Sequence, residues 1–157
     1  MNIISEKPPP DGSGVPYSSL TIGVPRELFP NERRVALTPQ NTALLRKKGF
    51  ANVLVERNAG TEAQFLDEHY AVAGANLVSR EELYGSTDIL LKVRPPIAGK
   101  EVEFLKEGST IISFLYPTQN QALVESLTSR NVNAFAVRLR KYRYSTCKAY
   151  INSTRWK

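Results

Sequence analysis

The chain has 157 residues, enough for one domain with a buried core, and its 41% hydrophobic and 23% charged residues are typical of a globular protein. No apolar run approaches the roughly 20 residues that cross a bilayer, and a single cysteine and a single histidine exclude an internal disulfide framework and a multi-histidine metal site. The net charge of +6 lies at one end: residues 138–157 hold seven basic and no acidic residues, which leaves 14 of the 21 basic residues against 15 acidic ones elsewhere. A basic tail can bind phosphates non-specifically, but it does not characterise the nearly neutral remainder.

The first 17 residues predict a flexible leader. They read MNIISEKPPPDGSGVPY, with three consecutive prolines and a Gly-Ser-Gly run. The segment lacks the apolar core of a secretion signal and the Arg-rich amphipathic pattern of an organelle transit peptide.

After this leader, apolar runs alternate with helical patterns. Strands are predicted at residues 20–24, 53–55, 88–93, 110–115 and 132–137. Helices are predicted at residues 38–49, 67–73 and 120–130, with a further helix that begins at Ser79. Strands this apolar are buried on both faces. The pattern predicts an α/β fold with a doubly wound, mainly parallel sheet and helices on both faces, a Rossmann-like or flavodoxin-like lobe.

Ligands of such sheets bind beyond the carboxyl ends of the strands, and the first strand runs into PREL and NERRVALTP there. Arg33 and Arg34 precede a helix start and could hold a carboxylate or phosphate bidentately. The alternative is that both arginines pair with Glu27 and Glu32 in a solvated cluster.

The next two apolar strands also end in residues that could contact a ligand. Lys92 interrupts a strand, which is costly unless its ammonium finds a partner, and both Lys92 and Arg94 lie at that strand's carboxyl end. Either could face a bound anion, or Lys92 could extend to solvent along the sheet edge. Tyr116 follows the next strand and could donate a hydrogen bond into the same crevice, or pack at its rim.

No dinucleotide fingerprint follows any strand. The sequence has no GxGxxG, Walker or GxSxG motif and no Cys/His ligand spacing. The residues by themselves therefore predict no bound cofactor and no metal site.

Several segments together resemble a known family. GVPYSSLTIGVPREL, NERRVALTP, LLKVRPP and ISFLYP, over residues 14–137, are similar to the alanine dehydrogenase and pyridine nucleotide transhydrogenase N-terminal family. The first run looks most like the animal-type, proton-translocating transhydrogenases. The resemblance implies an activity that passes hydride from NADH to NADP, coupled to proton movement through a membrane domain.

In the dehydrogenase branch of this family, residues matching Arg34 and Lys92 grip the substrate, and a histidine after the next strand serves as acid and base. This chain has Tyr116 at that position, and its one histidine, His69, lies elsewhere. A group that titrates near neutral pH is therefore missing where amino-acid deamination needs it, which favours the transhydrogenase branch. The pocket candidates are Arg34, Lys92 and Tyr116.

The resemblance ends at Val137, so three parts are expected: a leader at 1–17, an N-terminal lobe at 18–137 and a divergent basic tail at 138–157. The family's cofactors are NAD and NADP, but the Gly-rich lobe that binds the dinucleotide is not found here, so this chain alone is expected to bind neither. The tail is expected to be a frameshift, a read-through or an alternative exon rather than a nucleic-acid arm.

The expected function is that of a transhydrogenase fragment that is inactive alone. The alternatives are a fragment of an alanine dehydrogenase-like oxidoreductase and a non-catalytic binding or regulatory short form. The expected partners are a second copy of the chain or a full-length transhydrogenase, with no specific nucleic acid and a membrane only through absent domains. By family, the location is the matrix side of the mitochondrial inner membrane.

Overall fold

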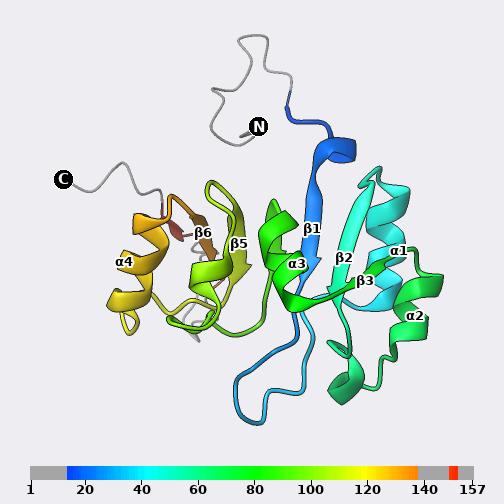
Figure 1. Cartoon of the computed structure of the whole chain (residues 1–157), viewed down its shortest axis with the longest axis horizontal. Helices are drawn as coiled ribbons and strands as arrows, with labels where there is room; N and C mark the ends of the chain where they lie inside the picture. The colour runs from blue at the N-terminus through cyan, green and yellow to red at the C-terminus, as the bar shows by residue number, and fades with distance from the viewer. Residues whose placement is uncertain (1–13, 138–148, 152–157) are drawn as a thin grey trace, which may run out of the picture.

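The computed structural model describes residues 14–137 and 149–151. They form one β-sheet with helices packed on both of its faces (Figure 1). The first 13 residues of the leader predicted at 1–17, and most of the basic tail, lie outside the described residues. The helices are α1 (Pro39–Lys47), α2 (Asp67–Val72), α3 (Arg80–Ser86) and α4 (Gln121–Ser129), with short 3-10 helices at Tyr17–Ser19, Thr61–Ala63 and Val102–Phe104. The strands are β1 (Thr21–Val24), β2 (Asn52–Glu56), β3 (Asn76–Val78), β4 (Ile89–Leu91), β5 (Thr110–Ser113), β6 (Asn133–Ala136) and β7 (Ala149–Ile151).

The sheet is mainly parallel, as predicted. Its strand order is β3-β2-β1-β4-β5-β6-β7, and only β7 runs antiparallel to its neighbour β6. The chain order reverses at β1, which pairs with β2 on one side and with β4 on the other. A reversal of this kind opens a crevice beyond the carboxyl ends of the two central strands, the usual ligand site of such folds.

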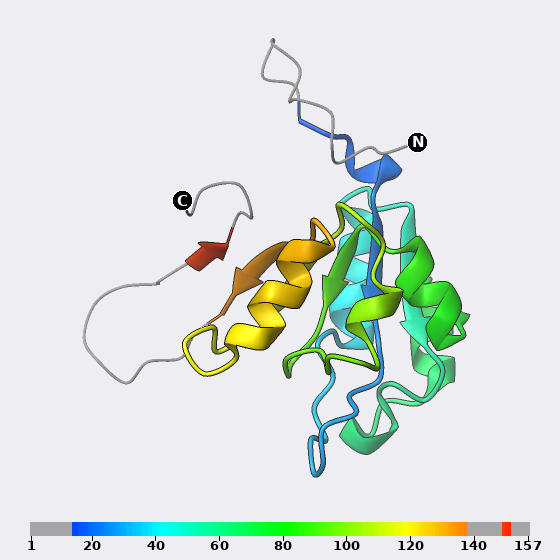
Figure 2. The same cartoon turned by 60° about the vertical axis from the view of Figure 1, so that its left-hand side comes forward.

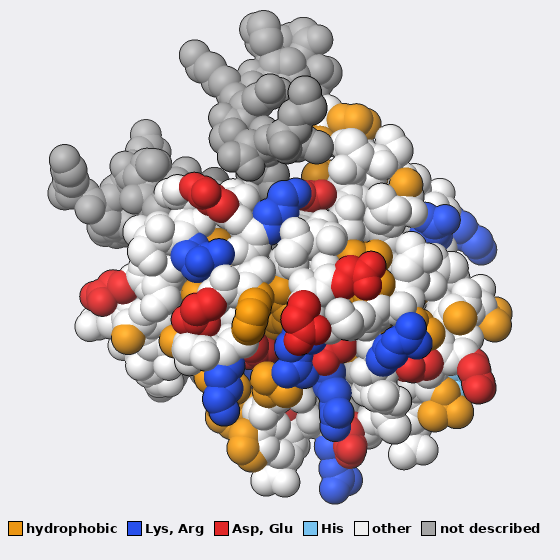
Figure 3. All heavy atoms as spheres, in the orientation of Figure 1, with side chains coloured by type: hydrophobic (Ala, Val, Ile, Leu, Met, Phe, Trp, Pro, Cys, Tyr) orange, Lys and Arg blue, Asp and Glu red, His pale blue; other side chains and the backbone are white. Residues whose placement is uncertain are grey.

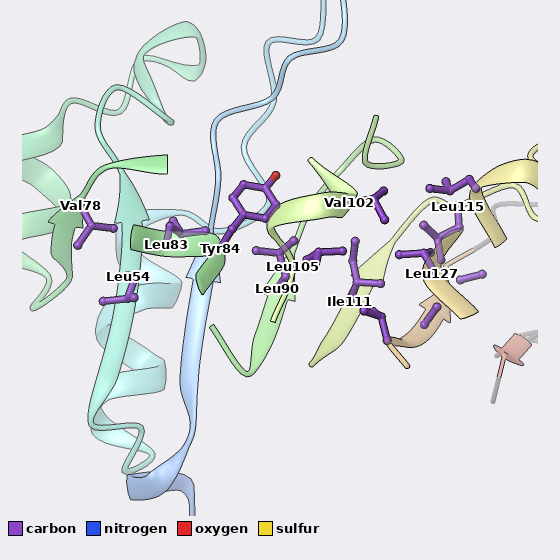
Figure 4. Close-up of a cluster of buried hydrophobic side chains, with 14 residues drawn as sticks. Leu54, Val78, Leu83, Tyr84, Leu90, Val102, Leu105, Ile111, Leu115 and Leu127 are labelled. Atoms are coloured by element: carbon purple, nitrogen blue, oxygen red, sulfur yellow. The ribbon is translucent and has the colours of Figure 1, made fainter. Parts of the chain in front are cut away.

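Helices cover both faces, which confirms the doubly wound prediction. On one face, α3 and α4 pack over an apolar cluster that includes Val78 on β3, Leu54 on β2 and Ile111 on β5 (Figure 4). On the other face, a second cluster is built around Val53, Val55 and Tyr70, and there α1 packs against β2 and α2 against β3. The Tyr70 hydroxyl donates to the Leu37 carbonyl at 2.8 Å, so this buried phenol has its partner.

Two helix starts follow the predicted capping residues. Thr38 Oγ1 accepts from the Asn41 N–H at 3.3 Å, with Pro39 at the first helical position. Ser79 Oγ accepts from the Glu82 N–H at 3.3 Å and begins α3. The helix starts are therefore fixed by local chemistry that the sequence displays.

The strand ends differ from prediction by one or two residues. The third predicted strand, 88–93, is confined to Ile89–Leu91, and the fourth, 110–115, to Thr110–Ser113. Asp88 lies just before the strand, where its Oδ2 accepts the Thr21 N–H at 3.0 Å, and Lys92 lies one residue past the strand end. Sequence reasoning did not predict β3, a short edge strand of three residues.

One close approach sets the position of α3. A Cβ on Gly23 would lie 2.2 Å from Thr87 Oγ1, so only glycine fits on β1 at that point. Thr87 ends α3 and donates its hydroxyl to the Leu83 carbonyl at 2.6 Å. The helix can therefore lie directly against β1, the strand at which the sheet order reverses.

Candidate functional site

The loop of residues 25–38 joins β1 to α1 and extends below the carboxyl ends of the strands in both views (Figures 1 and 2). It carries both of the acidic residues and both of the arginines that the sequence analysis considered as partners. The structure places Glu27 in a buried group and Glu32 and Arg34 in a more exposed one, and Arg33 in neither.

The first group is buried around Lys92. Its ammonium lies 2.9 Å from Glu27 Oε2 and 3.3 Å from Glu101 Oε1, and the three side chains are only 1%, 3% and 0% exposed. This placement answers the question left by the sequence, since the lysine finds two carboxylate partners instead of extending to solvent. Glu27 is thereby used by Lys92 and not, as the solvated-cluster alternative had it, by Arg33 or Arg34.

Both carboxylates of this group are also held by backbone N–H groups. Glu27 accepts from the N–H of Val93 at 2.6 Å and from that of Arg94 at 3.3 Å, and Glu101 accepts from the N–H of Ile97 at 2.8 Å. These bonds fasten the loop after β1 to the chain leaving β4. A buried ion pair is stable only when its remaining hydrogen-bonding capacity is satisfied in this way.

Tyr84 completes the buried group from α3. Its hydroxyl donates to Glu101 Oε1 at 2.6 Å. Burial, and then the charge of Glu101, raise the pKa of Tyr84 far above its usual value, so this phenol stays protonated and remains a donor at any ordinary pH.

The second group is centred on the carboxylate of Glu32, and its two arginines are partly exposed to solvent. Arg34 binds this carboxylate bidentately, with Nε to Oε1 and Nη2 to Oε2 both at 2.7 Å, and Arg94 Nε reaches Oε2 at 2.7 Å from the other side. The Arg34 side chain is 60% exposed and that of Arg94 35%, whereas the Glu32 side chain is 4% exposed. Two guanidinium groups from distant segments thus converge on one shielded carboxylate.

This pairing lowers the pKa of Glu32 strongly. The hydrogen bonds from Arg34 lower the pKa of Glu32 to about 2, although burial opposes the shift, and the bond from Arg94 adds to it. The same pairing with Glu32 raises the pKa of Arg34, and the nearby Tyr116 and Glu27 contribute. Both partners are therefore charged throughout the physiological range.

Tyr116 lies next to this group in a groove of about 620 Å³, which is also lined by Phe29, Arg94 and the first residues of α4. Its φ of +48° is unusual for a bulky residue. Its carbonyl accepts from the N–H groups of Gln119 and Asn120, which form the turn into α4. Strained backbone of this kind is found preferentially at functional positions.

Arg94 forms one wall of the same groove. Its guanidinium lies 5.0 Å from the centre of the Phe29 ring, a distance suited to a cation–π contact. The ring and the carboxylate of Glu32 together hold this cation in place at the groove's edge.

A second cavity, of about 370 Å³, lies where the carboxyl ends of β4 and β5 meet the loop. It is lined by Arg34 and Lys92 together with mostly apolar residues such as Leu91, Ile112 and Phe114. Arg34 and Lys92 therefore border one cavity, although the Lys92 ammonium itself is sequestered between Glu27 and Glu101.

The structure thus brings Arg34, Arg94 and Tyr116 to the same end of the sheet. Lys92 lies at this end too, but it is buried between Glu27 and Glu101. Glu101 and Tyr84 were missed by the sequence analysis. Glu101 belongs to the irregular connection between β4 and β5, and no local pattern marks it as a partner of Lys92.

Among residues 14–137 and 149–151, no group of three or more His, Cys, Asp or Glu side chains is arranged to hold a metal ion. None of the described helices has the length and apolarity of a membrane span. The site is thus built from arginine, tyrosine, lysine and glutamate, which suit the recognition of anions and polar groups by hydrogen bonds and charge.

Comparison with known proteins assigns the chain to a family. Residues 23–141 match the family model described as alanine dehydrogenase/PNT, N-terminal domain. The chain is 41% identical over 118 residues to NAD(P) transhydrogenase subunit alpha of Haemophilus influenzae, covering 75% of this chain and 22% of that protein. It is 35% identical over 117 residues to alanine dehydrogenase 2 of Staphylococcus aureus, covering 74% of this chain and 31% of that protein.

A solved structure agrees with these matches. The transhydrogenase from Sinorhizobium meliloti superposes with a TM-score of 0.71 at 29% identity, over 74% of this chain and 33% of that one. The chain therefore spans between about a fifth and a third of the length of the relatives it matches. With the family model matched over most of its length, this chain belongs to the alanine dehydrogenase and pyridine nucleotide transhydrogenase family, whose N-terminal domain it carries.

Proposed function

We propose that this chain is the first lobe of an NAD(P) transhydrogenase, an enzyme that passes hydride from NADH to NADP coupled to proton translocation. The similarity to transhydrogenase alpha subunits at about 40% identity supports this branch. The observation that carries the choice is Tyr116. It lines the same groove as Arg94, at the position where the resemblance implies a histidine in the dehydrogenase branch. A phenol does not exchange protons near neutral pH as an imidazole does.

In this proposal, NAD and NADP are the cofactors of the whole enzyme and are not held by this chain alone. Arg34 and Tyr116, together with Arg94, form the face that this lobe presents to a ligand, and Lys92 supports that face from behind. Hydride transfer depends on holding two partners in register, so the lobe alone is catalytically silent.

Two chimeras test the proposal and separate it from the alanine dehydrogenase alternative. Residues 23–137 replace the matching segment in the Haemophilus influenzae transhydrogenase subunit and, separately, in the Staphylococcus aureus alanine dehydrogenase. We expect the first chimera to retain transhydrogenation and the second to lack alanine deamination until Tyr116→His is introduced. Deamination by the second chimera with Tyr116 in place would favour the dehydrogenase alternative. Hydride exchange by the purified 157-residue chain with no other subunit would overturn the view that it is silent alone.

A second candidate function is a binding form that associates with a longer subunit of the family or with its own copy. Ile112 and Phe114 point to the face of β5 opposite Ile111, whose side chain belongs to the covered cluster. Together with exposed Val137 they line the 370 Å³ cavity, and both Ile112 and Phe114 are only half-buried. Apolar surface left in this way is typical of a face that another chain covers. Size-exclusion chromatography of the chain alone, and mixed with a full-length transhydrogenase, measures whether either complex forms.

The division of the chain into a leader at 1–17, a lobe at 18–137 and a tail at 138–157 stays a prediction, as does the origin of the tail. Translation of the other two reading frames after the codon for Val137 tests that origin. The mitochondrial location implied by the resemblance also stays a prediction, since the relatives named above are bacterial. Specific binding of nucleic acid is not part of the proposal.

A further inference from the structure

The loop between β1 and α1 lines a polar cavity of about 470 Å³, and two of its three arginines are used by neither proposed function. Three arginines line it: Arg26, Arg33 and Arg34. The remaining wall is formed by other residues of the loop and by Ala59 and Glu62, which follow β2. In Figure 3, basic and acidic side chains crowd the lower edge of the molecule, where this loop lies in Figure 1.

Two of the three acidic residues at this cavity are already paired. Glu27 is buried against Lys92, and Glu32 is shared between Arg34 and Arg94. Neither carboxylate makes an ion pair with Arg26 or Arg33. Only Glu62, which is exposed, has no such partner among the described residues.

The guanidinium groups of Arg26 and Arg33 form an ion pair with none of these three carboxylates. Both side chains are exposed, and within residues 14–137 and 149–151 neither makes an ion pair or a side-chain hydrogen bond. The backbone at residue 26 is nevertheless fixed, because its N–H donates to Glu56 Oε2 at 2.8 Å. Two unpaired cations at the edge of one fixed cavity raise the local concentration of anions.

The position of the cavity fits a ligand site. It lies beyond the carboxyl ends of β1 and β2, beside the point where the strand order reverses. Guanidinium groups present parallel N–H donors that match phosphate oxygens better than a lysine ammonium does. We propose that this cavity binds a small phosphorylated molecule, whose phosphate is held between Arg26 and Arg33. This site goes beyond the proposed transhydrogenase function, because it depends on Arg26 and Arg33, and neither belongs to the face formed by Arg34, Arg94 and Tyr116.

Inorganic pyrophosphate is the probe, titrated into the full 157-residue chain at an ionic strength of about 0.15 M, where exposed charges are substantially screened. NMR of the arginine side-chain Nε resonances identifies which guanidinium groups respond. We expect saturable shifts at Arg26 and Arg33, and a roughly tenfold or greater loss of affinity in the double variant Arg26→Gln and Arg33→Gln.

The matched control is the double variant Lys47→Gln and Lys48→Gln, which removes the same charge at the far end of α1 and should change affinity less than about twofold. Equal weakening by both double variants would show that pyrophosphate responds only to net charge, and would overturn the proposal. Shifts confined to residues 138–157 would assign the binding to the basic tail and overturn it as well. So would the absence of saturable binding to the unmodified chain, which needs no variant to fold.

Discussion

The two charged groups of the loop after β1 begin only five positions apart, at Glu27 and Glu32, yet they differ in nearly every physical respect. Around Glu27, an ammonium and two carboxylates are almost fully excluded from solvent. Around Glu32, two arginines share one carboxylate and remain partly in water. The difference teaches that charge at the end of a parallel sheet can serve either to hold a loop in place or to meet a ligand, and that burial distinguishes the two roles.

The largest expected effect tests the buried group. Lys92→Met leaves Glu27 and Glu101 buried without their cation, which should lower the free energy of unfolding by about 3–5 kcal/mol. Urea denaturation followed by circular dichroism measures this change. Lys100→Met, at an exposed position after the same strand, should stay within about 0.5 kcal/mol of the unmodified chain. If both variants unfold alike, the buried group does not stabilise the fold.

A smaller effect is expected at the phenol of the same group. Tyr84→Phe removes one donor to Glu101 and should cost about 1.5–3 kcal/mol, the usual range for a hydrogen bond to a charged group. The same denaturation experiment reports it. An unchanged free energy of unfolding would mean that Glu101 is fully satisfied by Lys92 and the Ile97 N–H.

The exposed group should respond to acid. Because pairing with Arg34 lowers the pKa of Glu32 to about 2 in the folded chain, against 4.5 ordinarily, its contribution is complete above pH 4.5 and is lost as the pH falls toward 2. Urea unfolding at pH 6, 4 and 2.5 should show a steeper loss of stability in this window for the unmodified chain than for Glu32→Gln. Parallel pH profiles of the two proteins would contradict the pairing.

The smallest effect on stability is expected at Arg34. Its side chain is 60% exposed, so Arg34→Met should change the free energy of unfolding by less than about 1 kcal/mol. The same substitution in the active transhydrogenase chimera should reduce activity if this arginine meets the ligand. A large loss of stability would place Arg34 with the buried group and remove the contrast between the two.

Much of the fold could be predicted because its signals are local. Thr38-Pro39 and Ser79 mark helix starts with their own side chains, and the apolar runs around Val55 and Ile111 identify buried strands. β3 escaped prediction because three residues at a sheet edge carry too little periodicity. The neighbours of Arg34 were partly foreseen, since Glu32 lies two residues away.

The buried partners of Lys92 could not be found in the same way. Glu27 is 65 residues distant in the chain, and Glu101 lies in an irregular connection, so only the folded sheet brings them together. The sequence did indicate that a lysine interrupting an apolar strand needs a partner. What it lacked was the strand order, which sets β1 beside β4 and the loop of one against the end of the other.

The backbone bonds of Glu27 have a mechanical consequence. Because its carboxylate accepts the N–H groups of Val93 and Arg94, the loop that carries Arg34 cannot swing away from the segment that carries Arg94 without breaking buried contacts. The backbone segments that carry the two guanidinium groups are therefore tied to each other at Glu27. If a ligand is enclosed by closure of a second lobe, we expect the hinge to lie outside this loop, because bending within it would break the buried contacts of Glu27.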